Sequence, residues 1–179
     1  MDENLKEEVL ERGKRFQEEL DKIAMAIGHL VMRFNRLDRE LGEVIYLVVG
    51  SYKPHIREVF TASLSFAQKV DMLSALLLEK HKNDTDNLQT LKQKIKKIKD
   101  FEKQRNTIMH SWWGTEQFGD DNFISTKQRV RGGKGLVTST VPADADKIMQ
   151  VCSDIDSFLW LELCRMHTIG EEKANKAIK

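Results

Sequence analysis

Apolar residues recur every three to four positions over the first fifty residues, which is the spacing of one face of an α-helix. The pattern predicts a long helix up to about residue 49, with an interruption near Gly28 or Gly42 because glycine weakens a helix interior. A turn is expected at Gly50–Pro54. The apolar positions are Leu5, Val9, Phe16, Leu20, Ile23, Ile27, Leu30, Phe34, Leu37, Leu41, Val44 and Val48.

Three further stretches keep the helical spacing. They cover roughly residues 55–82, 86–112 and 144–167. The polar run Lys82–Asp86 separates the first two and holds residues that cap helix N-termini well. These patterns predict a mainly helical protein with short connections.

The periodicity changes after Trp112-Trp113-Gly114. Residues 123–130 and 136–141 are rich in β-branched side chains, and the glycine-rich segment 131–135 joins them. Two such runs around a glycine-rich turn predict a β-hairpin. The predicted fold is therefore an all-α bundle of about four to five helices with an inserted β-hairpin near residues 123–141.

A chain of 179 residues fits one domain with a sizeable core. We expect an acidic helical lead-in over residues 1–22, a single helical domain over residues 23–168 and a polar tail over residues 169–179. No internal repeat or linker divides the sequence further.

Charged residues cluster locally along the sequence. The formal net charge is only +1, so the total charge does not indicate binding to nucleic acid or to a membrane. Residues 1–21 hold eight acids against four bases, and residues 92–105 hold seven bases against two acids. Such runs are typical of solvated helix faces. The basic run also leads directly to a polar motif at residues 105–110, so a surface that receives a polyanion stays open as an interpretation.

The two cysteines and the N-terminus indicate a reducing, cytoplasmic setting. Cys152 and Cys164 lie in one predicted helix, roughly 18 Å apart at 1.5 Å per residue, so they cannot form a disulfide with each other. The N-terminus is acidic and lacks the apolar stretch of a signal peptide. The longest apolar run, Val44–Val49, is far short of the ~20 residues that a bilayer requires, so no membrane contact is expected.

The histidines are dispersed over different predicted elements, and none forms a His-Glu-x-x-His motif or a Cys-His pair at zinc spacing. We therefore expect no metal site and no cofactor. The segment Gly132–Gly135 lacks the spacing of a phosphate-binding loop and is interpreted as a hairpin turn. The histidines are His29, His55, His81, His110 and His167.

The run Arg105-Asn106-Thr107-Ile108-Met109-His110 is the sharpest functional signal. Asn106 and His110 are four residues apart and share a helix face, whereas Arg105 lies about 140° from His110. A structural interpretation remains open here. In it, Arg105 pairs with a carboxylate and His110 caps the helix end, where an imidazolium suits the helix dipole.

The motif resembles the signature of the HEPN superfamily, an Arg and a His separated by four to six residues near the end of a long helix. Resemblance to helical proteins found widely in bacteria extends over roughly residues 27–163. The predicted hairpin departs from the minimal helical bundle, and Asp38 stands where related sequences tend to carry Glu. The further matching stretches are Gly28…Phe34-x-x-Leu37-Asp38-x-x-Leu41 and Leu64-Ser65-Phe66-x-x-Lys69.

The resemblance implies a metal-independent endoribonuclease that acts as a homodimer in toxin–antitoxin, phage-defence or RNA-processing settings, with RNA and an antitoxin or other protein as partners. Such chemistry needs no metal, because the 2′-hydroxyl of RNA is the nucleophile, an imidazole moves the proton and a guanidinium holds the developing charge. We expect His110, Arg105 and Asn106 to form the catalytic set, with Asn106 orienting His110 or the phosphate. Asp38 is expected to support this set by orienting Arg105 or His110. Lys99 and Lys103 are expected to bind flanking phosphates of the RNA.

Two other classes of function stay open. The first is a non-catalytic helical dimer that binds a protein partner or a nucleotide through the same groove, because some members of the superfamily are scaffolds. The second is a structural dimer in which the motif helix only packs. Trp112 and Trp113, just past the motif, are candidate contact residues in any dimer, although burial in the monomer is an equal alternative.

Overall fold

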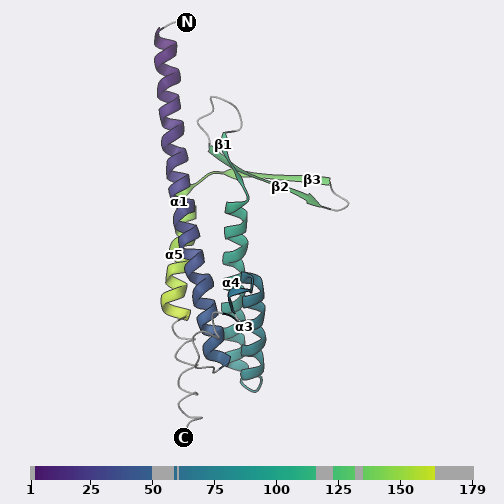
Figure 1. The fold of residues 1–179 in the computed structure, drawn as a ribbon. Coiled ribbons are helices and arrows are strands. Elements are labelled where there is room, and N and C mark those ends of the chain that lie inside the picture. The colour runs from purple at the N-terminus through teal and green to yellow at the C-terminus, as the bar shows by residue number, and fades with distance from the viewer. Residues whose placement is uncertain (1–2, 50–58, 60, 116–122, 132–134, 164–179) are drawn as a thin grey trace. The chain divides into compact units, whose positions relative to one another are not determined.

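The computed structural model describes residues 3–49, 59, 61–115, 123–131 and 135–163 (Figure 1). These residues are mostly helical and include a small antiparallel sheet, as the sequence predicted in outline. The predicted turns at residues 50–54 and 132–134 and the tail at residues 169–179 lie outside the described residues. In chain order the elements are α1 (Glu3–Val49), α3 (Phe66–Lys80), α4 (Thr85–Met109), β1 (Trp112–Thr115), β2 (Phe123–Arg131), β3 (Gly135–Pro142), α5 (Ala145–Phe158) and a short π-helix, Leu159–Leu163.

Helix α1 is continuous over all of its 47 residues, so the interruption expected near Gly28 or Gly42 is wrong. Gly28 is exposed, and a side chain there would meet open space. Gly42 is buried, and a Cβ at this position would lie 3.3 Å from Oγ1 of Thr61. Glycine at position 42 therefore permits a close approach of Thr61 instead of breaking the helix.

The chain divides into two compact units. The bundle unit consists of residues 32–103 and 153–179, and the motif unit consists of residues 1–31 and 104–152. Helices α1, α4 and α5 each contribute residues to both units.

The bundle unit packs four helical segments around one apolar core. Phe34 of α1 lies 4.4 Å from Phe66 of α3 between ring centroids, and Phe101 of α4 lies 5.7 Å from Phe158 of α5. Burying each large apolar side chain contributes roughly 1.5–3 kcal/mol. The buried apolar positions of this unit are Phe34, Leu37, Leu41, Val44, Ile45, Val70, Leu73, Leu77, Leu91, Ile95, Ile98, Phe101, Ile155, Phe158, Leu159 and Leu163.

Ion pairs also join neighbouring helices of the same bundle, one of them through the buried side chain of Lys69. The exposed pair, Lys99–Asp71, contributes little, because exposed pairs are worth about 0–1 kcal/mol. The pairs are Lys69–Asp38 at 2.8 Å between α3 and α1, Lys99–Asp71 at 2.8 Å between α4 and α3, and Arg33–Asp156 at 2.7 Å between α1 and α5.

Capping residues set where α3 and α4 begin. The helix predicted over residues 55–82 is interrupted among the described residues: residues 59, 61 and 62 are helical, residues 63–65 are not, and a capping box of Ser65 and Gln68 starts α3. The predicted N-cap in the polar run before α4 is confirmed, since Oδ1 of Asp84 accepts a hydrogen bond from the backbone N–H of Asn87 at 3.2 Å.

Helix α5 also begins at a capping side chain. Oδ1 of Asp144 accepts a hydrogen bond from the backbone N–H of Lys147 at 3.1 Å, and this bond lowers the pKa of the Asp144 carboxyl. The helix predicted over residues 144–167 continues as a π-helix after Phe158, and its last predicted residues lie outside the described part of the chain. Cys152 is buried in α5.

The motif unit contains a three-stranded antiparallel sheet in the order β1-β2-β3. The predicted hairpin is confirmed, with Ser125 opposite Val141 and Lys127 opposite Ser139. Strand β1 was not predicted, and it places Trp113 opposite Ser125. Since directly opposed residues share a face, these five side chains belong to one side of the sheet.

Candidate functional site

The motif lies at the C-terminal end of α4 in the motif unit. Arg105 and Asn106 are half-buried in the last turns of the helix, and Nη1 of Arg105 donates to Oδ1 of Asn106 at 2.8 Å. His110 is exposed and follows Met109, the last residue of α4. The structure therefore brings Arg105 and Asn106 together and places His110 in the turn after the helix.

Side chains from the following turn and sheet cap the end of α4. A helix leaves its last four carbonyl groups without partners inside the helix. Three of those four accept hydrogen bonds here, which ends the helix three residues before the predicted end at 112. The pairs are Lys127 Nζ to Asn106 O at 2.8 Å, Ser111 Oγ to Thr107 O at 2.6 Å and Trp113 Nε1 to Ile108 O at 3.2 Å.

This cap leaves the His110 imidazole without a role at the helix end. Among the described residues, no hydrogen bond or ion pair joins the imidazole to another side chain. The neighbouring Ser111 and Trp113 take the capping positions instead. The exposed imidazole can move a proton, and the half-buried guanidinium of Arg105, five residues earlier in the sequence, can stabilise an anion.

Asp38 makes its contact within the bundle unit. Its Oδ2 atom accepts a hydrogen bond from Nζ of Lys69 at 2.8 Å, and the Lys69 side chain is only 9% exposed. Its Oδ1 atom is buried and has no hydrogen-bond partner among the described residues. The observed partner of this carboxylate is thus a lysine of α3.

The basic run of α4 is partly engaged in contacts within the bundle unit. Lys99 pairs with Asp71 at 2.8 Å in an exposed position, and Lys103 is exposed. Lys94 pairs with Glu162 at 2.9 Å. An exposed pair costs little to open, so Lys99 can exchange Asp71 for another anion.

A pocket of about 270 Å³ lies between the end of α4 and the hairpin, within the motif unit. It combines four hydroxyl groups, one amine and two apolar side chains. Sequence reasoning missed it, because the sheet register brings its residues together from three elements. The lining residues are Thr107, Ser111, Ser125, Lys127, Val137, Ser139 and Val141.

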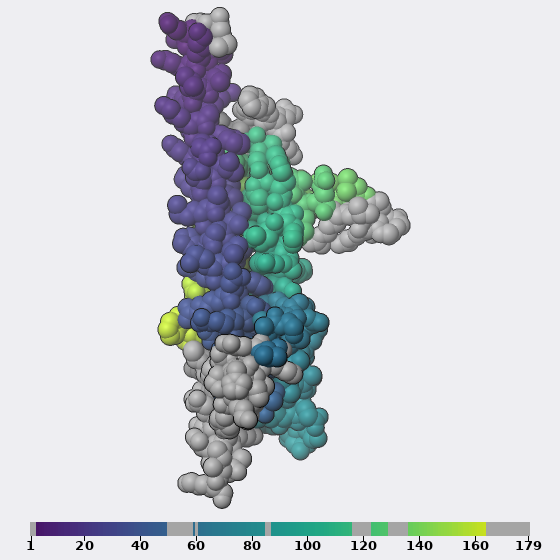
Figure 2. Space-filling model, in the orientation of Figure 1, coloured from purple at the N-terminus to yellow at the C-terminus, as the bar shows by residue number. Residues whose placement is uncertain are grey.

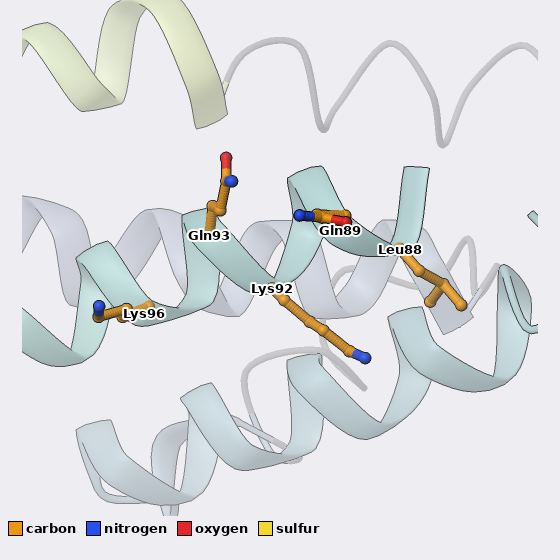
Figure 3. Close-up of a pocket in the computed structure, with 5 residues that line it drawn as sticks. All are labelled: Leu88, Gln89, Lys92, Gln93 and Lys96. Carbon is orange, nitrogen blue, oxygen red and sulfur yellow. The ribbon is translucent and has the colours of Figure 1, made fainter. Parts of the chain in front are cut away.

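A second hollow, of about 530 Å³, lies on α4 in the bundle unit. Figure 3 shows its lysine and glutamine side chains extending in different directions and not toward one centre. The described lining of this hollow holds no carboxylate, imidazole, thiol or hydroxyl group. The described lining residues are Leu88, Gln89, Lys92, Gln93 and Lys96.

Within the described ranges, no three His, Cys, Asp or Glu side chains come together as a metal site would require. No described helix is long and apolar enough to cross a membrane. Searches of protein-family models, of curated proteins and of solved structures found no match to this chain.

Proposed function

We propose that the protein is a metal-independent endoribonuclease of HEPN type that acts as a homodimer. One observation carries the proposal: Lys127, Ser111 and Trp113 cap the helix end, which leaves His110 exposed in the turn directly after the helix that carries the Arg105–Asn106 pair. The type of reaction is inferred from the resemblance of the Arg-x4-His motif to the signature of that superfamily.

In the proposed reaction, the 2′-oxygen of RNA attacks the adjacent phosphorus and the bond from phosphorus to the 5′-oxygen breaks. One proton leaves the 2′-hydroxyl and one reaches the departing 5′-oxygen, so the products are a 2′,3′-cyclic phosphate and a 5′-hydroxyl. His110 transfers one of these protons. Arg105 binds the phosphoryl oxygens as negative charge develops, and Asn106 positions the guanidinium.

A second copy would supply the second proton-transfer group. The reaction needs both an acid and a base, and two-fold symmetry doubles one His and one Arg. The motif unit exposes an apolar stripe on α1, defined by Leu5, Val9 and Phe16, which are 50%, 57% and 40% exposed. Trp112 is 58% exposed and lies against Gly114, where a side chain would overlap its indole. We propose that a second copy covers these residues.

Light scattering at micromolar protein concentration should therefore give a molecular mass of about 41 kDa, twice the 20.7 kDa of one chain. Val9→Glu should shift the mass toward that of a monomer, because a buried unpaired carboxylate is costly. Lys14→Gln changes the net charge equally on the opposite face of α1 and should leave the mass unchanged. If the wild-type protein has the mass of a monomer throughout the micromolar range, the proposed dimer is wrong.

The reaction itself is tested with purified protein, labelled single-stranded RNA and an excess of chelator. We expect cleavage to persist, because no step uses a metal. If purified protein freed of any co-purified partner cleaves no RNA at high concentration, a non-catalytic scaffold that binds a protein or a nucleotide becomes the better proposal.

A further inference from the structure

Strand β3 forms one edge of the sheet, because the strand order is β1-β2-β3 and no other described strand pairs with it. All residues from Leu136 to Pro142 are exposed, and Figure 2 shows the strand, in green, on the surface of the molecule. Proteins commonly protect such an edge with charged residues, a proline or a bulge. Residues 135–141 contain no charge and no proline, and their register with β2 has no bulge, so the edge is open to another strand.

The register of β3 on β2 shows which backbone groups of β3 point outward. In an antiparallel pair, opposite residues alternate between pairs that exchange two backbone hydrogen bonds and pairs that exchange none. The N–H of Ala143 donates to the backbone oxygen of Phe123 at 2.8 Å, so positions 141, 139 and 137 also bond to β2. The N–H and C=O groups of Leu136, Thr138 and Thr140 therefore point away from β2. Within the described part of the chain, no residue bonds to these groups.

One face of β3 lines the pocket of about 270 Å³. Val137, Ser139 and Val141 alternate along the strand and line this pocket together with Lys127 of β2. The two valines are 37% and 53% exposed, and Lys127 is half-buried. No acidic side chain is among the described lining residues. Hydroxyl groups and an ammonium group donate hydrogen bonds, so the pocket favours a carboxylate, the acceptor that an ammonium group binds most strongly.

We propose that the free edge of β3 binds an extended peptide segment of another protein as a further antiparallel strand, with an acidic side chain of that segment in the pocket. Backbone hydrogen bonds at the edge supply affinity, and the pocket supplies specificity, as in other strand additions to a sheet edge. The peptide residue opposite Ser139 shares its face, and neighbouring strands lie about 4.8 Å apart, so a glutamate there reaches the pocket. Apolar residues two positions before and after that glutamate contact Val137 and Val141.

Another protein fits this edge better than a second copy of the chain does. A second β3 strand would bring no carboxylate to the pocket, because residues 135–142 contain no acid. Trp112, which the proposed dimer covers, belongs to β1, and β1 lies on the other side of β2. The proposed dimer therefore leaves the β3 edge free, and the peptide proposal does not depend on ribonuclease activity.

The probe is a synthetic peptide, acetyl-Thr-Val-Thr-Glu-Thr-Val-Thr-amide, added to the wild-type protein while amide hydrogen exchange is followed by NMR. The outward amides of Leu136, Thr138 and Thr140 should exchange rapidly in the free protein. At a peptide concentration of about nine times Kd, their exchange should slow about tenfold, because only the unbound tenth of the protein exchanges. If the peptide does not bind, or binds without slowing exchange at these three amides, the proposal is overturned.

Two methylated peptides provide a matched pair that leaves the protein unchanged. N-methylation of the threonine directly before the glutamate removes a donor that points at β3, and binding should weaken about ten- to hundredfold. N-methylation of the glutamate itself places the methyl group on the outer edge, and binding should be retained. An equal loss for both peptides contradicts the antiparallel register. Replacing the glutamate with glutamine should weaken binding about five- to tenfold, and unchanged binding would contradict the acidic anchor.

A pair of protein variants tests the same edge from the other side. Thr138→Pro removes one outward N–H, at a position where an edge strand tolerates proline, and should abolish peptide binding. Thr138→Val keeps the N–H and should bind the peptide within about twofold of the wild-type protein. If Thr138→Pro fails to fold, the methylated peptides decide. If the wild-type protein alone forms assemblies larger than a dimer that Thr138→Pro abolishes, the occupant is a second copy and the proposal is wrong.

Discussion

Replacing His110 with alanine should abolish RNA cleavage while leaving the fold intact. Removing a positioned acid–base group typically costs about 10²–10⁴-fold in rate. The side chain is exposed and the helix end is capped by other residues, so the free energy of unfolding should change by no more than about 0.5 kcal/mol. Single-turnover cleavage, helical circular dichroism and the melting temperature measure these effects.

Gln104→Ala is the matched control for this variant. Gln104 is exposed on the last turns of α4 and has no part in the proposed reaction, so activity and melting temperature should both be retained. If His110→Ala unfolds the protein, His110 stabilises the helix end after all. If it cleaves RNA at the wild-type rate, His110 is not the proton-transfer group.

Replacing Arg105 with lysine should lower kcat by about 10²–10³-fold, because the loss resembles that of one donor to a transition-state oxyanion. Lysine keeps the charge but lacks the planar fork of five donors, which can hold Asn106 and a phosphoryl oxygen together. The change in KM should stay within a few-fold, because the lost interaction forms in the transition state.

Asn106→Ala distinguishes positioning from direct catalysis. Asn106 accepts a hydrogen bond from Arg105, so its loss should lower kcat less than the loss of Arg105 does. In the Arg105→Lys background, Asn106→Ala should have little further effect, because the two residues act as a unit. If the Arg105→Lys variant is fully active, a single positive charge is enough for catalysis. That result would contradict the role of the planar guanidinium of Arg105.

Local periodicity explains why much of the fold could be predicted. The spacing of apolar residues in α1 and the β-branched runs of β2 and β3 are visible within single stretches of sequence. The expected break at Gly42 was wrong because packing against Thr61 outweighs the intrinsic weakness of glycine. Strand β1 was missed because its four residues become a strand only by pairing with Phe123–Thr126.

In the candidate site, too, local features could be predicted from the sequence and contacts between distant residues could not. The Arg105–His110 run is local and was found in the sequence. The cap from Lys127 was missed because it joins residues 21 positions apart. Asp38 was predicted as a supporting residue and Lys99 as an RNA-binding residue, and the structure gives each a partner of opposite charge on α3, namely Lys69 and Asp71. Sequence spacing alone does not show such contacts between helices.

The most direct test of the central claim is the chemical identity of the RNA ends that the wild-type protein produces in excess chelator. We expect fragments with a 2′,3′-cyclic phosphate and a 5′-hydroxyl, because the nucleophile belongs to the RNA and no metal takes part. The His110→Ala protein, purified in parallel, should yield neither end and so exclude a contaminating nuclease. Fragments with a 3′-hydroxyl and a 5′-phosphate, or cleavage that stops when the chelator is added, would contradict the account.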